Sequence, residues 1–267
     1  AQSGVSCGGL SSARNAGLCR ATGEYILFLD GDDFWAEPEG LARLIPQLTS
    51  DVVVFGFSKW YEPNGAERGR WIGPDIAERC PASGREAQLG YLLQKGCYTA
   101  CAWNKAVRRE LFSSCDLRFR EGVTSEDIDW CARLALAAKS FGLSACRFYR
   151  YRQRTGSITR TMNLKSLRDL KENIELCLRL PQEMGASTAI KELYWSYVAY
   201  QFGTFLVCAP SVNGPEGRGL VQEMREKRWL LRYNAASRKV QLLYVVDRLL
   251  GYRALCLLCR GYAAIRK

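Results

Sequence analysis

Apolar residues follow two different periods in the first half of the chain. Continuous apolar runs of strand length predict strands at 25–29, 52–55 and 145–151. Residues that recur with helical spacing predict helices at 11–21, 38–48, 84–95 and 125–138. Helices that alternate with uniformly apolar strands are typical of an α/β sheet covered on both faces.

The second half of the chain keeps only the helical period. Helices are expected at 164–180, 190–207 and 219–233, with breaks at Pro181 and in the segment 210–215. In the first half, Pro63-Asn64-Gly65 predicts a turn, in a hairpin or a mobile loop. The change of pattern divides the chain into an α/β domain at 1–158 and a C-terminal all-helical region at 159–267.

The helix expected from Ser125 opens with an acidic turn. Ser125 is suited to cap this helix, and Ile128 and Leu134 share its apolar face. Glu126 and Asp127 lie in its first turn, where the helix dipole and free amides favour an ionised carboxylate. Asp127 is therefore expected to be a base at neutral pH, with simple N-terminal capping as the alternative.

Positive charge is concentrated at one end of the chain. The net charge is +11, and ten Lys or Arg against the single acid Asp247 place nine of these charges in the segment 227–267. From Arg238 to Lys267, apolar residues are interleaved with basic ones, which predicts an amphipathic basic helix. Such a helix suits an anionic bilayer surface. The alternative is a helix that packs on the α/β domain with its arginines in water.

The composition argues against several classes of protein. Twelve cysteines scattered in apolar contexts among 267 residues indicate reduced, buried thiols in the cytoplasm and not a disulfide scaffold. Cys256 and Cys259 form a C-x-x-C pair, but without a second pair or any histidine no zinc site is expected. No nucleic-acid motif accompanies the positive charge, and no apolar run is long enough to span a bilayer.

Three carboxylates follow the apolar run at 25–29, namely Asp30, Asp32 and Asp33. Open α/β sheets bind their ligands at the carboxyl ends of the strands. Crowded carboxylates repel one another, and a divalent cation relieves this repulsion. Oxygen ligands on a short turn suit Mg²⁺ or Mn²⁺, with water and substrate phosphate completing the coordination. A solvated Asp-Gly turn is the alternative interpretation.

The run from Gly9 to Asp33 includes Ser-Ala-Arg-Asn at 12–15 and Leu-Asp-Gly-Asp-Asp at 29–33. This run resembles the core of the inverting family 2 glycosyltransferases, which have the GT-A fold. The resemblance implies that Asp30 and Asp32 bind the ribose of a nucleotide sugar and a divalent metal, Mn²⁺ or Mg²⁺, with Asp32 closest to the ion.

The same resemblance assigns the helix that carries Arg14 and Asn15 to the donor site, with Arg14 facing the base or the diphosphate. A salt bridge on the helix surface is the alternative for Arg14. Further segments at 102–112, 125–127 and 149–159 resemble the family in the same order, so that the resemblance covers residues 9–160.

Catalytic roles follow from the later segments. The resemblance implies that Asp127, with Glu126 beside it, is the catalytic base. Arg152 and Arg154 are implied to neutralise phosphate charge as the leaving group forms, in agreement with the bidentate fit of Arg to phosphate. A solvated basic strand end is the alternative for these two arginines.

The implied function is transfer of a sugar, with inversion, from a nucleoside-diphosphate sugar to a hydroxyl group. A UDP-sugar is the expected donor and a glycan or lipid-linked sugar the expected acceptor, in surface polysaccharide or glycan synthesis. Such a transfer needs a base for the acceptor proton and a cation for the leaving diphosphate. The expected location is the cytoplasm, at the inner face of the cell membrane if the basic tail binds lipid. Nucleic acid is not an expected partner.

The sequence departs from the family at its N-terminus. The two strands that usually precede this core, ending in Pro-x-Tyr-Asn and Asp-Asp-Gly-Ser turns, are missing, and the chain starts at Ala1 without methionine. A sheet without them would expose an unpaired edge, so an N-terminally incomplete GT-A domain is expected. An inactive fragment and a membrane-surface binding module are the alternatives. A nucleotidyltransferase of the same fold is another, since its Gly-rich N-terminal loop would fall in the missing segment.

Overall fold

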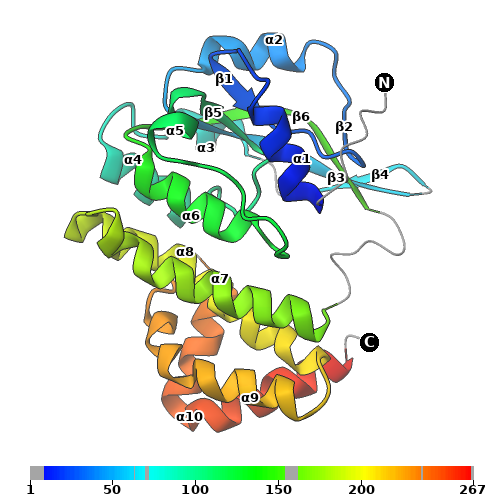
Figure 1. The fold of residues 1–267 in the computed structure, drawn as a ribbon, viewed down its shortest axis with the longest axis vertical. Helices are drawn as coiled ribbons and strands as arrows, with labels where there is room; N and C mark the ends of the chain where they lie inside the picture. Colours follow the sequence, from blue (N-terminus) through cyan, green and yellow to red (C-terminus); the bar gives the residue numbers. More distant parts are fainter. Residues whose placement is uncertain (1–8, 63, 70–71, 154–161, 236, 266–267) are drawn as a thin grey trace. The chain divides into compact units, whose positions relative to one another are not determined.

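The computed structural model describes residues 9–62, 64–69, 72–153, 162–235 and 237–265. The chain forms two compact units: Ala1–Gln88 with Ala100–Arg154, and Leu89–Thr99 with Thr155–Lys267 (Figure 1). The segment 89–99 thus belongs to the second unit, although its sequence pattern does not distinguish it from its neighbours. The predicted boundary at 158 lies outside the described residues and stays a prediction.

The first unit is built on a mixed sheet. Its described strands are β1 Tyr25–Leu27, β2 Phe34–Trp35, β3 Val52–Tyr61, β4 Ala66–Arg68, β5 Lys105–Arg108 and β6 Phe141–Gln153. Their order is β1-β5-β3-β6-β2, with β4 paired to β3. Among the described pairs only β3 and β6 run parallel. Strand β5 runs antiparallel to both of its neighbours, β1 and β3.

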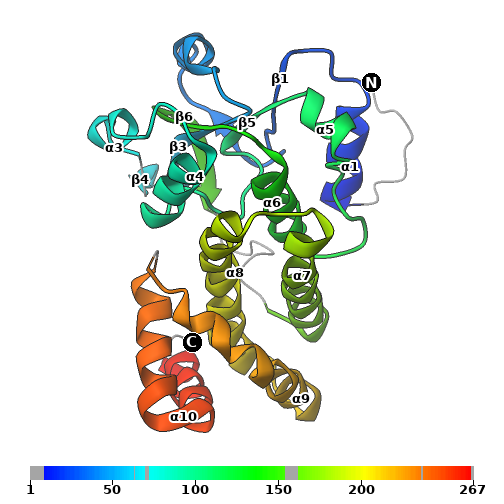
Figure 2. The ribbon, with the colours of Figure 1, turned by 90° about the vertical axis from the view of Figure 1, so that its left-hand side faces the viewer.

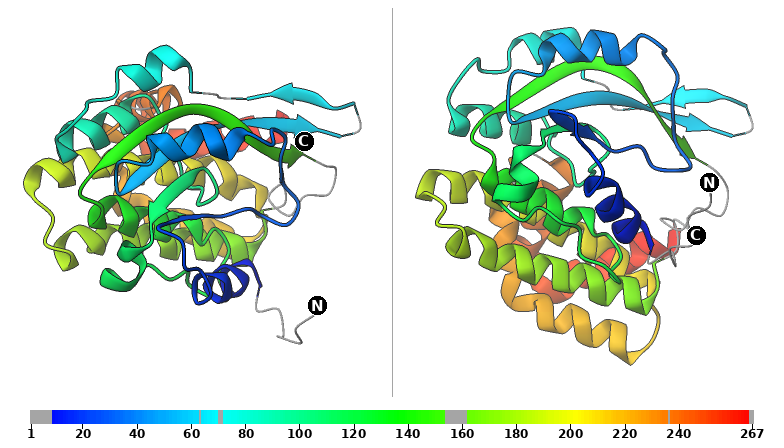
Figure 3. Two further views of the ribbon diagram at one scale, coloured as in Figure 1. Left: turned by 90° about the horizontal axis from the view of Figure 1, so that it is seen from above. Right: turned by 45° about the horizontal axis from the view of Figure 1, so that its top comes forward.

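Helices lie on both faces of this sheet, as the sequence predicts. They are α1 Gly9–Leu18, α2 Gly40–Leu44, η1 Ile45–Gln47, α3 Pro74–Glu78, α4 Arg85–Gln94, α5 Glu110–Ser114 and α6 Asp127–Ala137. Helix α2 covers one face and α6 the other (Figures 1 and 3). Where α2 meets β6, a Cβ atom on Gly40 would lie only 2.3 Å from the Cβ of Phe148, so this close approach requires glycine.

The predicted turn at 63–65 joins a hairpin. Strands β3 and β4 pair antiparallel, with Tyr61 opposite Ala66 and Lys59 opposite Arg68. Gly65 adopts a φ of 65°, in the left-handed region that glycine enters at little cost. The hairpin alternative is therefore confirmed.

An aromatic cluster connects the loop after β1 to α6. The Trp130 ring of α6 is fully buried and lies 4.8 Å from the Phe119 ring and 5.8 Å from the Phe28 ring, measured between centroids. The Trp130 indole N–H also donates to the carbonyl of Leu117. This packing fixes the start of α6 near the end of β1, which positions the residues described below.

The second unit is helical. Besides the end of α4 it contains α7 Leu164–Glu183, α8 Thr188–Cys208, η3 Ala209–Ser211, α9 Pro215–Glu223, η4 Met224–Arg232 and α10 Arg238–Ile265. The side chains of Asn163 and Ser187 accept hydrogen bonds from the first turns of α7 and α8. None of the described helices combines the length and the apolar character needed to cross a bilayer.

The predicted break at Pro181 is wrong, because α7 continues through it to Glu183. A proline inside a helix leaves the carbonyl four residues earlier without its usual partner. Here that carbonyl belongs to Cys177, and it accepts a hydrogen bond of 2.9 Å from the hydroxyl of Tyr194 on α8. A residue of the neighbouring helix thus compensates for the proline.

Candidate active site

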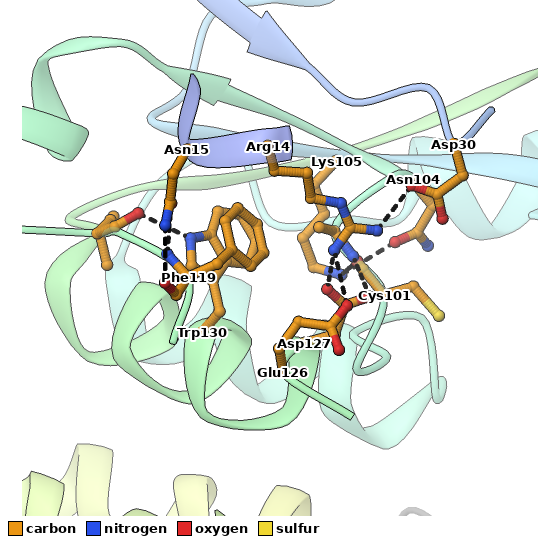
Figure 4. A network of polar contacts seen from close by, with 12 residues as sticks. Arg14, Asn15, Asp30, Cys101, Asn104, Lys105, Phe119, Glu126, Asp127 and Trp130 are labelled. Atoms are coloured by element: carbon orange, nitrogen blue, oxygen red, sulfur yellow. Dashed lines mark hydrogen bonds and ion pairs between the residues drawn. The ribbon is translucent and has the colours of Figure 1, made fainter. Parts of the chain in front are cut away.

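Four of the predicted site residues meet at one point of the first unit (Figure 4). Arg14 comes from α1, Asp30 from the loop after β1, and Glu126 and Asp127 from the start of α6. The Arg14 Nη2 lies 2.8 Å from Asp30 Oδ1, and its Nη1 lies 2.5 Å from Asp127 Oδ1 and 3.4 Å from Glu126 Oε1. One guanidinium therefore joins the predicted metal-binding loop to the predicted catalytic base.

Arg14 is buried and charged. It is 6% exposed, and its guanidinium carbon lies 5.0 Å from the centre of the Phe119 ring and 5.7 Å from that of Phe28. Burial lowers the pKa of Arg14, but the charges of Asp127 and Asp30 outweigh this effect and raise it above its ordinary value. The salt bridge considered for Arg14 is thus present, but it lies within the site and not on the helix surface, and the contact of Arg14 with the donor stays a prediction.

Asp127 is held by two groups. Its Oδ1 accepts from Arg14, and its Oδ2 accepts a hydrogen bond of 3.2 Å from the backbone N–H of Ala102. Burial raises the pKa of Asp127, while Arg14 and the Ala102 amide oppose this rise. Burial and the Asp127 charge likewise raise the pKa of Glu126. The helix dipole considered in the sequence analysis is thus not the dominant influence.

The predicted cap of this helix is wrong. Helix α6 starts at Asp127, and its N-cap residue is Glu126, which makes no side-chain capping hydrogen bond. Ser125 precedes the cap with a φ of 59°, in the left-handed region. Instead of capping the helix with their side chains, Glu126 and Asp127 face Arg14, so capping alone does not explain the two acids.

Asp33 has a structural position that differs from those of Asp30 and Asp32. It is buried, and its Oδ2 accepts a hydrogen bond of 2.6 Å from the Tyr149 hydroxyl while its Oδ1 accepts one of 2.9 Å from the Arg152 backbone N–H. The Tyr149 hydroxyl in turn accepts from the backbone N–H of Asp30. Asp33 therefore fastens the acidic loop to β6.

Asp33 should make stability depend on pH. Burial raises its pKa from 3.8 to about 6, against the hydrogen bonds from Tyr149 and Arg152. Below pH 4 the group is protonated in both states. As the pH rises towards 6, Asp33 ionises in the unfolded chain before it ionises in the folded protein. The free energy of unfolding therefore falls by up to about 3 kcal/mol.

We expect Asp33→Asn, which stays neutral, to lack this loss. Its free energy of unfolding relative to the parent should increase by about that amount between pH 4 and pH 7 in urea titrations. The matched control is Asp116→Asn, because the Asp116 side chain is 89% exposed. An equal pH-dependent difference for Asp116→Asn would contradict the explanation.

Asn15 holds a loop of the first unit. Its Nδ2 donates to the Phe119 carbonyl at 2.9 Å and to Glu121 Oε1 at 3.2 Å, and its Oδ1 accepts from the Phe119 N–H at 2.9 Å. The Phe119 ring stacks on Arg14. Asn15 thus shapes the wall of the site, and its direct role in donor binding stays a prediction.

Arg152 lies on β6 near the acidic loop. Its guanidinium lies over the Phe34 and Trp60 rings, and its Nη1 is 3.5 Å from Glu62 Oε1. Its Nε is buried without a hydrogen-bond partner, while the side chain as a whole is 35% exposed. Arg154, the other predicted phosphate ligand, lies outside the described residues.

The acidic loop does not by itself form a metal cage. Asp32 is exposed, Asp30 is half-buried and paired with Arg14, and Asp33 is engaged by Tyr149. Across the part of the chain that the structure describes, no group of three His, Cys, Asp or Glu side chains is placed to hold a metal ion. Two aspartates still suit Mg²⁺ or Mn²⁺ when substrate phosphate and water supply the other ligands.

Sequence reasoning missed two contributors to the site. Tyr149 lies in a segment that resembles the family, but only the fold brings its hydroxyl to Asp33. The Ala102 amide that binds Asp127 carries no side-chain signal at all. Lys105 is also fully buried, and its ammonium donates to the Cys101 carbonyl at 2.6 Å, which stabilises the turn that presents this amide.

Known proteins similar to this chain indicate its family and its fold. Residues 6–115 match the model of Glycosyl transferase family 2. This segment of the chain is that of a family 2 glycosyltransferase. It is 29% identical over 182 residues to the glycosyltransferase GlyA of Streptococcus pneumoniae, which covers 66% of this chain and 26% of GlyA. It is 28% identical over 166 residues to the cholesterol galactosyltransferase of Borreliella burgdorferi, covering 58% of this chain and 45% of that protein.

The fold is of the GT-A type. The crystal structure of S. aureus TarS 1-349 in complex with UDP-GlcNAc matches with a TM-score of 0.63 at 18% identity, over 96% of this chain and 72% of that one. The predicted fold class, with its C-terminal helical region, is thereby confirmed. The chain spans less than half the length of the two curated relatives.

Proposed function

We propose that this chain transfers a sugar from a nucleoside-diphosphate sugar to an acceptor hydroxyl, with inversion at the sugar. The observation that carries this proposal is the meeting of Asp30, Glu126 and Asp127 on Arg14, which puts a base and a candidate metal loop in one place. Membership of family 2 supports transferase chemistry.

Asp127 is the proposed base. It would take the proton of the acceptor hydroxyl as that oxygen attacks the anomeric carbon, and its burial-raised pKa makes it a stronger base than a solvated aspartate. The Ala102 amide and Arg14 fix the orientation of its carboxylate. Glu126 adds negative charge beside it and shares Arg14.

Asp30 and Asp32 are the proposed ligands of Mn²⁺ or Mg²⁺. The three carboxylates on Arg14 exceed its single positive charge, so the site favours a further cation. When bound, a divalent ion would stabilise the negative charge of the leaving diphosphate. Arg152, with its unpartnered Nε, is the proposed phosphate contact on β6, and Arg154 follows it in the sequence.

A UDP-sugar is the proposed donor, since the TarS structure of the same fold contains UDP-GlcNAc. The proposed acceptor is a hydroxyl of a glycan or of a lipid-linked sugar, in surface polysaccharide or glycan synthesis. The proposed location is the cytoplasmic side of a membrane, because no disulfide joins the cysteines within the described ranges. An anionic membrane surface is the third proposed partner.

The function is tested by sugar transfer from a panel of radiolabelled UDP-sugars to glycan and lipid-linked acceptors, with the complete gene product. We expect transfer that needs Mn²⁺ or Mg²⁺ and stops with EDTA. Asp32→Ala should abolish it, whereas Asp75→Ala, at an exposed aspartate of α3, should not.

The outcomes separate the parts of this proposal. Transfer that persists in EDTA would remove the metal while leaving the transferase. Tight binding of UDP-sugars without any transfer would favour the inactive-fragment alternative.

A further inference from the structure

Helix α10 has one face packed into the second unit. Val240 and Leu243 in its first part and Tyr252, Leu255 and Cys259 in its second part are at most 7% exposed. They pack beside α8 and η4. The Tyr252 hydroxyl donates a hydrogen bond of 2.7 Å to the Val221 carbonyl of α9. One face of the tail thus packs on helices of its own unit, while packing on the α/β domain, the alternative considered for the tail, stays a prediction.

The two parts of α10 form a hairpin. Gly251 between them has φ 77° and ψ 167°, which a helix does not contain and which only glycine adopts readily. Burial and Cys256 raise the pKa of Cys259, near the end of the second part, and the charge of Lys239, near the start of the first, opposes this rise. A straight helix would separate these residues by about 30 Å. The second part therefore folds back beside the first (Figure 2).

The other face of this hairpin is apolar and exposed. Seven large apolar side chains there are between 48% and 76% exposed: Leu242, Val245, Leu249, Leu250, Leu257, Leu258 and Tyr262. Leu249, at 76%, and Leu250, at 63%, stand at the reversal itself. None of these seven residues belongs to the packed face.

Positive charge accompanies this exposed face. Four arginines on the two parts of α10 are exposed: Arg238, Arg248, Arg253 and Arg260. The single acid of α10, Asp247, has a side chain only 9% exposed and lies towards Arg228 of η4. The outward surface of the hairpin therefore combines leucines with arginines and offers no carboxylate of its own.

We propose that the α10 hairpin docks on an anionic lipid surface, with Leu249 and Leu250 entering the interface and the arginines contacting lipid phosphates. Apolar side chains flanked by basic ones are the composition that binds such surfaces. A second copy of the chain fits this face less well. A two-fold interface would bring the patch against itself and oppose arginine to arginine.

This inference rests on the proposed function for its membrane partner but not on the transferase activity, and its test needs no donor or acceptor. The chain is sedimented with vesicles of phosphatidylcholine alone and of phosphatidylcholine with phosphatidylglycerol, at low and at high salt. We expect binding to the anionic vesicles only, weakened by salt because the charges are exposed.

Three variants test the residues. Leu249→Gln with Leu250→Gln should weaken anionic vesicle binding by at least about tenfold, because the removed apolar surface no longer leaves water. Arg248→Gln and Arg253→Gln should each weaken it about fivefold. The matched controls are Ile45→Gln, at a position 61% exposed in the first unit, and Arg79→Gln, also exposed there. Neither control should change the binding.

Three outcomes would overturn the proposal. One is equal binding to neutral and anionic vesicles. Another is unchanged binding by the double leucine variant while its thermal unfolding matches that of the parent. The third is a concentration-dependent dimer of the parent in light scattering that is absent in the double leucine variant, together with no vesicle binding by the parent. That result would assign the face to a second copy of the chain.

Discussion

Replacement of Asp127 by Asn is expected to lower the rate of sugar transfer by about 10²- to 10⁴-fold, the range for loss of a general base. Binding of the nucleotide sugar should change by no more than a few-fold, because the base acts on the acceptor. The amide cannot take up the acceptor proton. It also has to place one N–H opposite either Arg14 or the Ala102 amide, since both donate to this carboxylate.

That donor conflict means that Asp127→Asn needs a structural control. Asp129 lies on the same helix, is fully buried, and is paired with Arg133 at 3.0 Å. Asp129→Asn should therefore disturb α6 by a comparable amount without touching Arg14. Transfer rates and melting temperatures of both variants are measured together. An equal loss of transfer in Asp129→Asn would show that the effect of Asp127→Asn is structural, and a larger loss in Glu126→Gln would move the base to Glu126.

The sequence was most informative where a local pattern decides the structure. Apolar runs located β1 and the start of β3, and Asn64-Gly65 located the β3–β4 hairpin. The strands β3 and β6 extend beyond these runs because pairing with each other and with β4 stabilises residues that are no longer uniformly apolar. Pro181 was misinterpreted because its compensating partner, Tyr194, belongs to another helix.

The candidate site was predictable only in part, because its contacts join distant segments. The acidic pattern identified Asp30, Asp32 and Asp33 as a group, yet only the tertiary position of Tyr149 distinguishes Asp33 from the other two. Helical spacing likewise indicated that the tail is amphipathic. Which face packs depends on the reversal at Gly251 and on the neighbouring helices, and no periodicity encodes that.

Arg14 is the clearest example of a site residue whose contacts join distant segments of the chain. The family resemblance assigned it to the donor, on the basis of its neighbours in sequence. In the fold it is paired with Glu126 and Asp127, which are 112 and 113 residues further along the chain. This pairing matters because of burial. A buried carboxylate without a cation beside it would take up a proton or destabilise the fold. We therefore propose that Arg14 is a positioning residue of the site.

Arg14→Gln is expected to lower the free energy of unfolding by about 3–5 kcal/mol near pH 8, as for other buried ion pairs that lose one partner. Without the guanidinium, the pKa values of Asp127 and Glu126 should rise further above those of the unfolded chain. Stability associated with such groups is present at low pH and is lost as the pH rises through the folded pKa. The difference from the parent should therefore be smaller at pH 5 than at pH 8 in urea titrations.

The same variant should slow transfer by at least about 10²-fold, since a misplaced base has an effect of that order. The acidic limb of the pH–rate profile should move to higher pH, because the proposed base would hold its proton more tightly. Arg14→Lys keeps the charge but loses the two-pronged contact, so it should restore the pH profile more fully than the rate. Arg133→Gln, which also removes an arginine from a buried aspartate, is the matched control: it should lower stability without moving the profile. If Arg14→Gln left the pH–rate profile in place, Arg14 would be a structural residue alone, and the proposed link between the acidic loop and Asp127 would be wrong.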